Sequence, residues 1–204
     1  MAYTIEEEQE LNQLKAWWSE NHKTVIASVV LAFAAIFAWN YWKSYQLVKN
    51  QQASAAYEHL IYTTRDDLTE RNKQIESFIK ENSNDAYATL ALLDKAKFEV
   101  EKQLYALAEK TLKQAISRAP DEILVSIAAL RLASVQYQQH DFNAALDSLK
   151  QVKSTAWDSK KYHLMGDIFL AKGDMANAKI NYEKAQQNAS PLEAQWLQVR
   201  LNNL

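Results

Sequence analysis

The sequence predicts an all-α protein in which one N-terminal transmembrane helix precedes a solenoid of paired helices. Three observations carry this prediction. The chain of 204 residues contains only two glycines and two prolines, which is too few for the turns of a sheet-rich fold. An uncharged run near the N-terminus has the length of a helix that crosses a bilayer. Beyond that run, apolar residues recur at three- and four-residue steps, as they do on one face of a helix.

The uncharged run covers residues 24–42. These 19 residues would form roughly 28 Å of helix at about 1.5 Å per residue, close to the ~30 Å hydrocarbon core of a bilayer. Aromatic residues flank the run on both sides, as they do at the two headgroup layers of a membrane: Trp17, Trp18, Trp39, Tyr41, Trp42 and Tyr45. We therefore assign residues 24–42 to a transmembrane helix and residues 1–23 to an acidic tail. The lipid bilayer is then an expected partner of the chain.

Two other interpretations of the run are a core helix of a soluble protein and a cleaved signal peptide. Core helices rarely have aromatic residues clustered at both ends. A signal peptide begins with a basic segment, whereas glutamates outnumber Lys15 and Lys23 before this run. An uncleaved anchor is therefore favoured. Lysines are equally frequent near its two ends, so charge alone does not decide which side of the membrane holds the large domain.

Residues 43–84 are predicted to form a membrane-proximal helical hairpin. No residue between 39 and 64 breaks a helix, so the anchor should continue as one long or gently bent helix. Its apolar face is formed by Ala53, Ala56, Tyr57, Leu60 and Ile61. A second helix is expected over residues 67–82, with one face formed by Ile75, Phe78 and Ile79. Polar residues at 82–85 supply the turn that follows it.

Residues 85–204 are predicted to repeat a helical hairpin three times and to end with a capping helix at 192–204. The pairs are expected at residues 85–103 with 105–118, 122–138 with 142–153, and 159–171 with 175–188. Aligning their second helices places Ala108, Ala145 and Ala178 in register, at spacings of 37 and 33 residues. These spacings bracket the period of about 34 residues that is typical of tetratricopeptide repeats. The sequence therefore predicts a tetratricopeptide-like solenoid.

Close packing explains the residue types at the repeated positions. A small side chain where two antiparallel helices cross lets them approach, and a large one a turn later fills the groove between them. The third hairpin has glycine at its crossing, whereas Ala96 and Ala133 replace that glycine in the first two hairpins. The residues expected to pack the repeats are Ala108, Ala145, Gly166, Ala178, Tyr182 and Ala185.

A solenoid of this type presents a concave face, formed mainly by the first helix of each hairpin. By the repeat register, the residues expected to line this face and bind a partner are Leu93, Lys97, Leu130, Ser134, Tyr137, His163 and Asp167. Their mixture of apolar and charged side chains suits a chain segment or a partner helix better than a small-molecule substrate.

No catalytic, cofactor or metal site is expected. The four histidines are far apart and lack the spacing of metal-ligand pairs. Two glycines cannot form a phosphate-binding or dinucleotide-binding loop, and a chain without cysteine has neither disulfides nor thiol chemistry. A net charge of −2 offers no basic surface for nucleic acid. The sequence thus predicts a non-enzymatic interaction protein without a cofactor.

From end to end the chain resembles the YfgM family, ancillary subunits of the bacterial Sec translocon. The stretches that carry this resemblance are Trp17 and Trp18, residues 39–44, the turn at 172–174 and the C-terminal residues 200–204. The resemblance implies a single-pass protein of the inner membrane, with a cytoplasmic N-terminus and a periplasmic repeat domain. It also implies two partners, the Sec translocon and a membrane-anchored periplasmic chaperone of the prolyl-isomerase type, PpiD. The implied function is to help pass translocated chains to periplasmic chaperones.

A second hypothesis is a membrane-tethered scaffold or regulator that sequesters a signalling protein through its cytoplasmic tail, residues 1–23. The two hypotheses assign the function to different parts of the chain. A chain without residues 44–204 would lose the translocon-linked function and keep one that depends on the tail.

Overall fold

The computed structural model describes residues 5–63, 68–82 and 86–204. These residues form nine α-helices and one short 3-10 helix, and no strand occurs among them, which confirms the predicted all-α fold. Residue 67 of the second predicted helix and residues 83–85 of the turn predicted at 82–85 lie outside the described residues. The chain divides into two compact units, 1–52 and 53–204, which are described separately.

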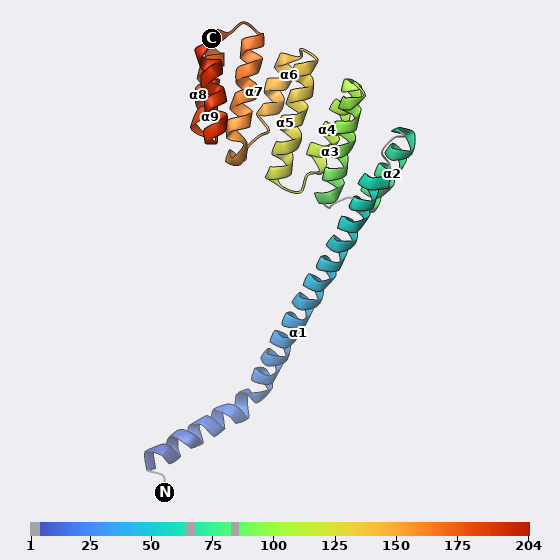
Figure 1. Ribbon diagram of the computed structural model, residues 1–204. Coiled ribbons are helices and arrows are strands. Elements are labelled where there is room, and N and C mark those ends of the chain that lie inside the picture. The colour runs from blue at the N-terminus through green and yellow to red at the C-terminus, as the bar shows by residue number, and fades with distance from the viewer. Residues whose placement is uncertain (1–4, 64–67, 83–85) are drawn as a thin grey trace. The chain divides into compact units, whose positions relative to one another are not determined.

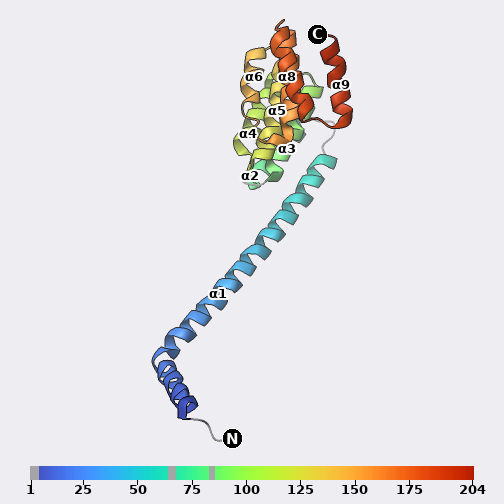
Figure 2. The ribbon, with the colours of Figure 1, turned by 90° about the vertical axis from the view of Figure 1, so that its left-hand side faces the viewer.

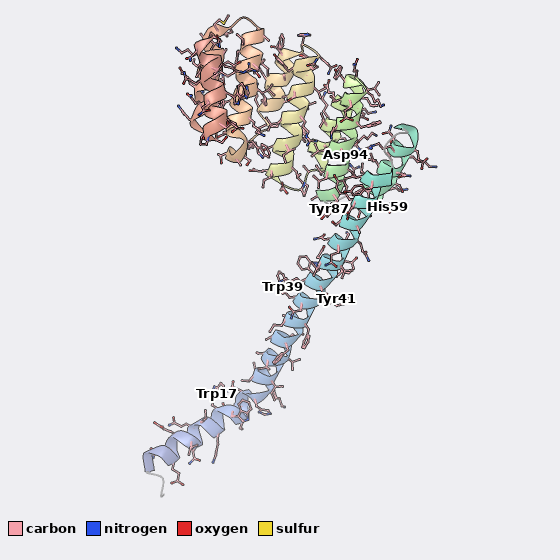
Figure 3. The ribbon with its side chains drawn as sticks, viewed as in Figure 1. Trp17, Trp39, Tyr41, His59, Tyr87 and Asp94 are labelled. Atoms are coloured by element: carbon pink, nitrogen blue, oxygen red, sulfur yellow. The ribbon has the colours of Figure 1, made fainter. Side chains whose placement is uncertain are left out.

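Helix α1 (Ile5–Thr63) contains the apolar run (Figure 1). It begins at Ile5, so residues 5–23 of the acidic tail belong to the same helix as the anchor. Trp17 precedes the apolar run, and Trp39 and Tyr41 lie around its end (Figure 3). Within the described part of the chain, α1 alone has the length and apolar composition needed to cross a membrane. Its apolar side chains are exposed, Leu31 by 70% and Phe37 by 71%, so the core of a soluble domain does not account for them.

The second unit contains the end of α1 from Ala53 onward and all the later helices. Their bounds are α2 (Leu68–Glu81), α3 (Ala86–Glu101), α4 (Tyr105–Arg118), α5 (Glu122–Gln138), α6 (Phe142–Leu149), η1 (Thr155–Trp157), α7 (Asp158–Ala171), α8 (Met175–Gln187) and α9 (Pro191–Asn202). Successive helices from α2 to α9 pack against one another, and Figures 1 and 2 show the hairpins side by side in chain order. This arrangement is the predicted solenoid.

Helix α6 is the one element that is clearly shorter than predicted, because it ends at Leu149 rather than near residue 153. Val152 is nevertheless fully buried, as the repeat pattern requires. Its carbonyl oxygen accepts a hydrogen bond of 2.8 Å from the Lys161 ammonium of α7. The chain therefore leaves the helix but keeps its apolar side chain in the core.

Three apolar clusters form the core, and each contains part of the repeated pattern. The first joins the end of α1 to α2–α5, the second joins α5–α7, and the third joins α7–α9. Ala108, Ala145 and Ala178 lie one in each cluster, and all three have no exposed surface. Alanine at these points lets the backbones of neighbouring helices approach closely.

The three hairpin turns share one backbone conformation. In each, the residue before the next N-cap has a positive φ angle and its N–H donates to a carbonyl three residues back: Gln103 (59°), His140 (60°) and Gly173 (80°). The following residue then caps the second helix. Asp141 and Asp174 do so through their carboxylates, which accept hydrogen bonds of 3.1 Å from Ala144 N and Asn177 N. Leu104 occupies the same position without a side-chain cap.

We expect Leu104→Asp to stabilise the protein by about 1 kcal/mol, because it adds the missing N-cap acceptor. The backbone at Leu104 (φ −86°, ψ 57°) already matches that at Asp141 (φ −85°, ψ 71°). The midpoint of denaturant unfolding measures the effect. Leu104→Ala, which removes the same side chain without adding an oxygen, is the control. Equal unfolding midpoints for the two variants would contradict the assignment of Leu104 to an N-cap position that lacks a side-chain acceptor.

Glu99 is a charged residue buried in the first hairpin. Its side chain on α3 has no exposed surface, and neither carboxylate oxygen accepts a hydrogen bond of ordinary geometry from the described residues. Burial raises the pKa of Glu99 above its ordinary value of 4.5, and the Thr111 hydroxyl and the Lys95 ammonium offset only part of that rise. The folded state therefore binds the Glu99 proton more tightly than the unfolded state does.

The free energy of unfolding should fall as the pH rises from about 4.5 through the raised pKa of Glu99. Glu99→Gln should remove this dependence and stabilise the protein by roughly 1–2 kcal/mol at pH 7, because no buried charge remains. Below pH 4.5 the difference should vanish. Denaturant unfolding of both proteins between pH 4 and about pH 8 provides the measurement. If the free energies of unfolding of parent and variant changed with pH in the same way, this account of Glu99 would be refuted.

Candidate partner-binding groove

A groove of about 590 Å³ runs across the first helices of the hairpins. Helices α3, α5 and α7 supply most of its lining, α4 contributes Leu112, and α9 contributes Glu193. Five of the seven residues that the repeat register predicts for the concave face line this groove: Lys97, Leu130, Ser134, His163 and Asp167.

Leu93 and Tyr137 differ from the prediction, because neither lines the groove. Leu93 is only 3% exposed and belongs to the core cluster around α3 and α4. Tyr137 lies near the end of α5, and its ring packs at 5.9 Å from that of Phe142 on α6. The repeat register identified the helices that line the groove. Each of these helices, however, contributes only some of the residues on its face to the lining.

Of the floor of the groove, sequence reasoning identified only Leu130. That floor consists of apolar side chains that also belong to, or pack against, the core clusters: Ala96, Val100, Leu112, Leu130, Val135 and Leu164. In the sequence their spacing is that of core residues. The signal that could have found them is their position one turn from a predicted groove residue, as for Val100 three residues after Lys97 and Leu164 three residues before Asp167.

Asp167 is held within the chain by side chains of three helices. The Tyr182 hydroxyl of α8 and Nη1 of Arg200 of α9 each donate a hydrogen bond of 2.7 Å to its Oδ1. His163 Nε2 lies 3.7 Å from its Oδ2. Burial, together with the Asp167 carboxylate, raises the pKa of Tyr182 well above 10.0, so its hydroxyl stays a neutral donor. Asp167 thus fixes one end of the groove by joining α7, α8 and α9.

The other charges around the groove fall into two groups. Glu101 pairs with Lys97 at 3.8 Å, and Glu193 accepts a hydrogen bond of 3.1 Å from the backbone N–H of Ser190 in a capping box. Arg131 and Lys160 make no ion pair with the described residues. Arg131 donates a hydrogen bond of 3.2 Å to the carbonyl of Leu93. The acidic groups are therefore engaged internally, whereas two cations keep their charge beside an apolar floor.

The chemistry of this groove is that of binding. No group of three or more potential metal ligands occurs in the part of the chain that the structure describes. An apolar floor bordered by separate charges matches a peptide or a helix, whose apolar side chains enter while polar groups remain at the rim. The fold, with a groove across its first helices, is that of a helical-repeat protein.

Comparison with known proteins agrees with this class. A family model described as "Tetratricopeptide repeat-like domain" matches residues 15–204. The solved structure "MamA RS-1 ArsTM double mutant" superposes with a TM-score of 0.53 at 15% identity, covering 74% of this chain and 84% of that one. At this identity the likeness concerns the fold alone.

Full-length relatives make the assignment more specific. The chain is 54% identical to the "Ancillary SecYEG translocon subunit" of Aggregatibacter actinomycetemcomitans and 48% identical to that of Haemophilus influenzae, with complete coverage of both chains in each case. It is 31% identical to the protein of the same name in Escherichia coli, covering 97% of this chain and 96% of that one. The chain therefore belongs to the family of ancillary SecYEG translocon subunits.

Proposed function

We propose that the chain is a non-enzymatic inner-membrane protein that associates with the Sec translocon and helps pass translocated chains to a periplasmic chaperone. The observation that carries the proposal is full-length identity of 54% and 48% to relatives named for the SecYEG translocon. In this proposal the N-terminus is cytoplasmic, residues 24–42 cross the membrane once, and residues 53–204 are periplasmic. The chaperone is a membrane-anchored prolyl isomerase, PpiD.

The anchor supports the membrane part of the proposal. Its apolar side chains are exposed along α1, and a bilayer would cover them. A helix has all its backbone groups paired internally, so it can cross the hydrocarbon core without other partners. Tethering places the repeat domain close to a membrane-embedded translocon and raises its local concentration there.

The groove supports the binding part of the proposal. Chains that leave a translocon are unfolded and expose apolar side chains. Val100, Leu130 and Leu164 are partly exposed in the groove and offer an apolar surface for such a side chain, and Arg131 offers a cation for a nearby carboxylate. The groove is accordingly proposed to hold a short segment of a client or of the chaperone.

Co-purification of the translocon with the tagged full-length chain from solubilised membranes tests the proposal. We expect the parent to retain the translocon and the chaperone. Ser134→Arg places a long cationic side chain at an exposed position in the groove, and should therefore reduce retention of the chaperone or of arrested client chains. Ser117→Arg, at an exposed serine of α4 outside the groove, is the matched control and should retain both.

Absence of the translocon from the parent sample would overturn the proposed association. Equal retention of chaperone and clients by both serine variants would instead remove the groove from the mechanism. If a chain without residues 44–204 retained all partners, the function would lie in the tail rather than in the repeats.

A further inference from the structure

The part of the groove between α3 and α5, which we call its α3–α5 end, has an unpaired positive charge. Its lining consists of Ala96, Lys97, Val100, Glu101, Leu130, Arg131 and Ser134. Lys97 pairs with Glu101 at 3.8 Å, and Asp94 of α3 pairs with Arg71 of α2. Arg131 makes no ion pair with the described residues. The Lys97 and Glu101 side chains are also 67% and 56% exposed, so their pair is weak and Lys97 can interact with a guest.

A hydrogen bond to the backbone of α3 positions the Arg131 side chain. Its Nη1 donates at 3.2 Å to the carbonyl of Leu93. Leu93 lies one helical turn before Lys97, so the guanidinium lies beside the turn of α3 that carries the second cation. A guanidinium has several N–H donors in a planar fork, and Arg131 is exposed. Donors not used by Leu93 can therefore bind both oxygens of a carboxylate, which is the geometry that arginine favours.

The charges at the opposite end of the groove are balanced within the chain. Asp167 of α7 accepts hydrogen bonds of 2.7 Å from side chains of α8 and α9. Hydrogen bonds from Ser190 lower the pKa of Glu193, and the Lys160 ammonium lowers it further, so Lys160 and Glu193 are near enough to interact. The excess of positive charge in the groove is thus located at the α3–α5 end.

Apolar side chains lie next to this charge. Val100 of α3 and Leu130 of α5 are partly exposed in the groove, and Leu130 directly precedes Arg131. An apolar side chain of a guest can bury its surface against them while a neighbouring carboxylate binds Arg131. A basic side chain in the same place would be repelled by Arg131 and would lose water without gaining a partner. The arrangement therefore distinguishes acidic apolar segments from basic ones.

We propose that the α3–α5 end of the groove binds an aspartate or glutamate side chain in an apolar segment of a translocated chain, and that Arg131 makes the groove select acidic over basic segments. This inference rests on the proposed function, which supplies the translocated chain. A chain that is still leaving a translocon has not released its C-terminus. A side-chain carboxylate, rather than a terminal one, is therefore the ligand.

Binding of labelled peptides to the full-length chain in phosphatidylcholine nanodiscs tests this selection. The probes are amidated peptides Ser-Leu-Leu-Xaa-Leu-Leu-Ser, in which Xaa is Asp, Asn or Lys, and fluorescence anisotropy measures their Kd. Binding that Ser134→Trp removes is assigned to the groove, because this substitution fills an exposed groove position without adding charge. For that binding, the Asp peptide should have a Kd at least about fivefold lower than that of the Lys peptide, with the Asn peptide between them. Equal Kd values, or a lower one for the Lys peptide, would overturn the selection.

Reversing the charge of residue 131 tests the role assigned to Arg131. Arg131→Glu should reverse the order, so that the Lys peptide binds more tightly than the Asp peptide. Lys110→Glu, at an exposed cation of α4 outside the groove lining, changes the net charge equally and should keep the preference for Asp. An unchanged preference in Arg131→Glu would contradict the proposal.

The peptides also separate failure of this inference from failure of the proposed function. If the Asp and Lys peptides bound equally and Ser134→Trp removed both, the groove would still bind segments, and only the selection by charge would be overturned. If no peptide bound the parent, both the selection and the proposed binding of segments in the groove would be overturned.

Discussion

Replacing Ala178 by arginine should lower the free energy of unfolding by more than about 3 kcal/mol, through overpacking and the burial of a charge. Ala178 has no exposed surface and lies in the apolar cluster of Tyr182, Ala185 and Leu197. An arginine there must either displace α8 from its neighbours or bury its guanidinium. The last hairpin cannot accommodate either without losing its packing.

Thermal unfolding of the full-length chain in detergent, followed by helical circular dichroism, measures this effect. A loss of that size lowers Tm by more than about 6 °C in a domain of this length. The control is Ile180→Arg, two residues along the same helix at a side chain that is 47% exposed. It should leave Tm within about 2 °C of the parent. An Ala178→Arg variant that melted with the control would show that the repeat register is wrong.

Gly166→Ala should cost about 1–3 kcal/mol, although it adds only one methyl group. A Cβ atom at residue 166 would lie 2.5 Å from both Cδ1 and Cε1 of the Tyr182 ring. The ring cannot easily move aside, because its hydroxyl is bound to Asp167 at 2.7 Å and its side chain is fully buried. The glycine therefore allows α7 and α8 to pack closely around the tyrosine.

A double-mutant cycle with Tyr182→Leu separates this clash from other effects of the glycine. With the ring removed, Gly166→Ala should become nearly neutral, so the two substitutions should couple by at least about 1 kcal/mol. Gly173→Ala is the contrasting control. Its cost should be about 1 kcal/mol from the positive φ of 80°, with no atom in the way, and should not depend on Tyr182. If Gly166→Ala and Tyr182→Leu lowered the free energy of unfolding additively, the proposed contact would be contradicted.

The helices could be predicted closely because the pattern in this chain is strong and has few interruptions. The predicted hairpin at 122–138 and 142–153 has its first helix at Glu122–Gln138, with the same bounds. Few glycines and prolines leave the ends of helices to local capping groups, such as Asp141 and Asp174, which can be read directly from the sequence. Periodicity also identified the small residues that the structure buries where helices cross.

Features that depend on contacts between helices could not be predicted in this way. Beyond the early end of α6, the carbonyl of Val152 accepts a hydrogen bond from Lys161, which comes from the next hairpin. The register placed Leu93 on the concave face, whereas the rotation of α3 in the stack buries it. Asp167 was predicted to contact a partner, and the structure shows that three side chains of its own domain surround it. A single helix pattern contains no information about which neighbour covers which face.

Protease treatment of spheroplasts that contain the full-length chain tests the central claim most directly, because the proposed function requires a periplasmic repeat domain. The account predicts that protease added outside removes residues 53–204 while a tag on the N-terminal tail stays protected inside. Protection of the repeat domain until the membrane is broken would place it in the cytoplasm. That result would contradict the proposed transfer of translocated chains to a periplasmic chaperone.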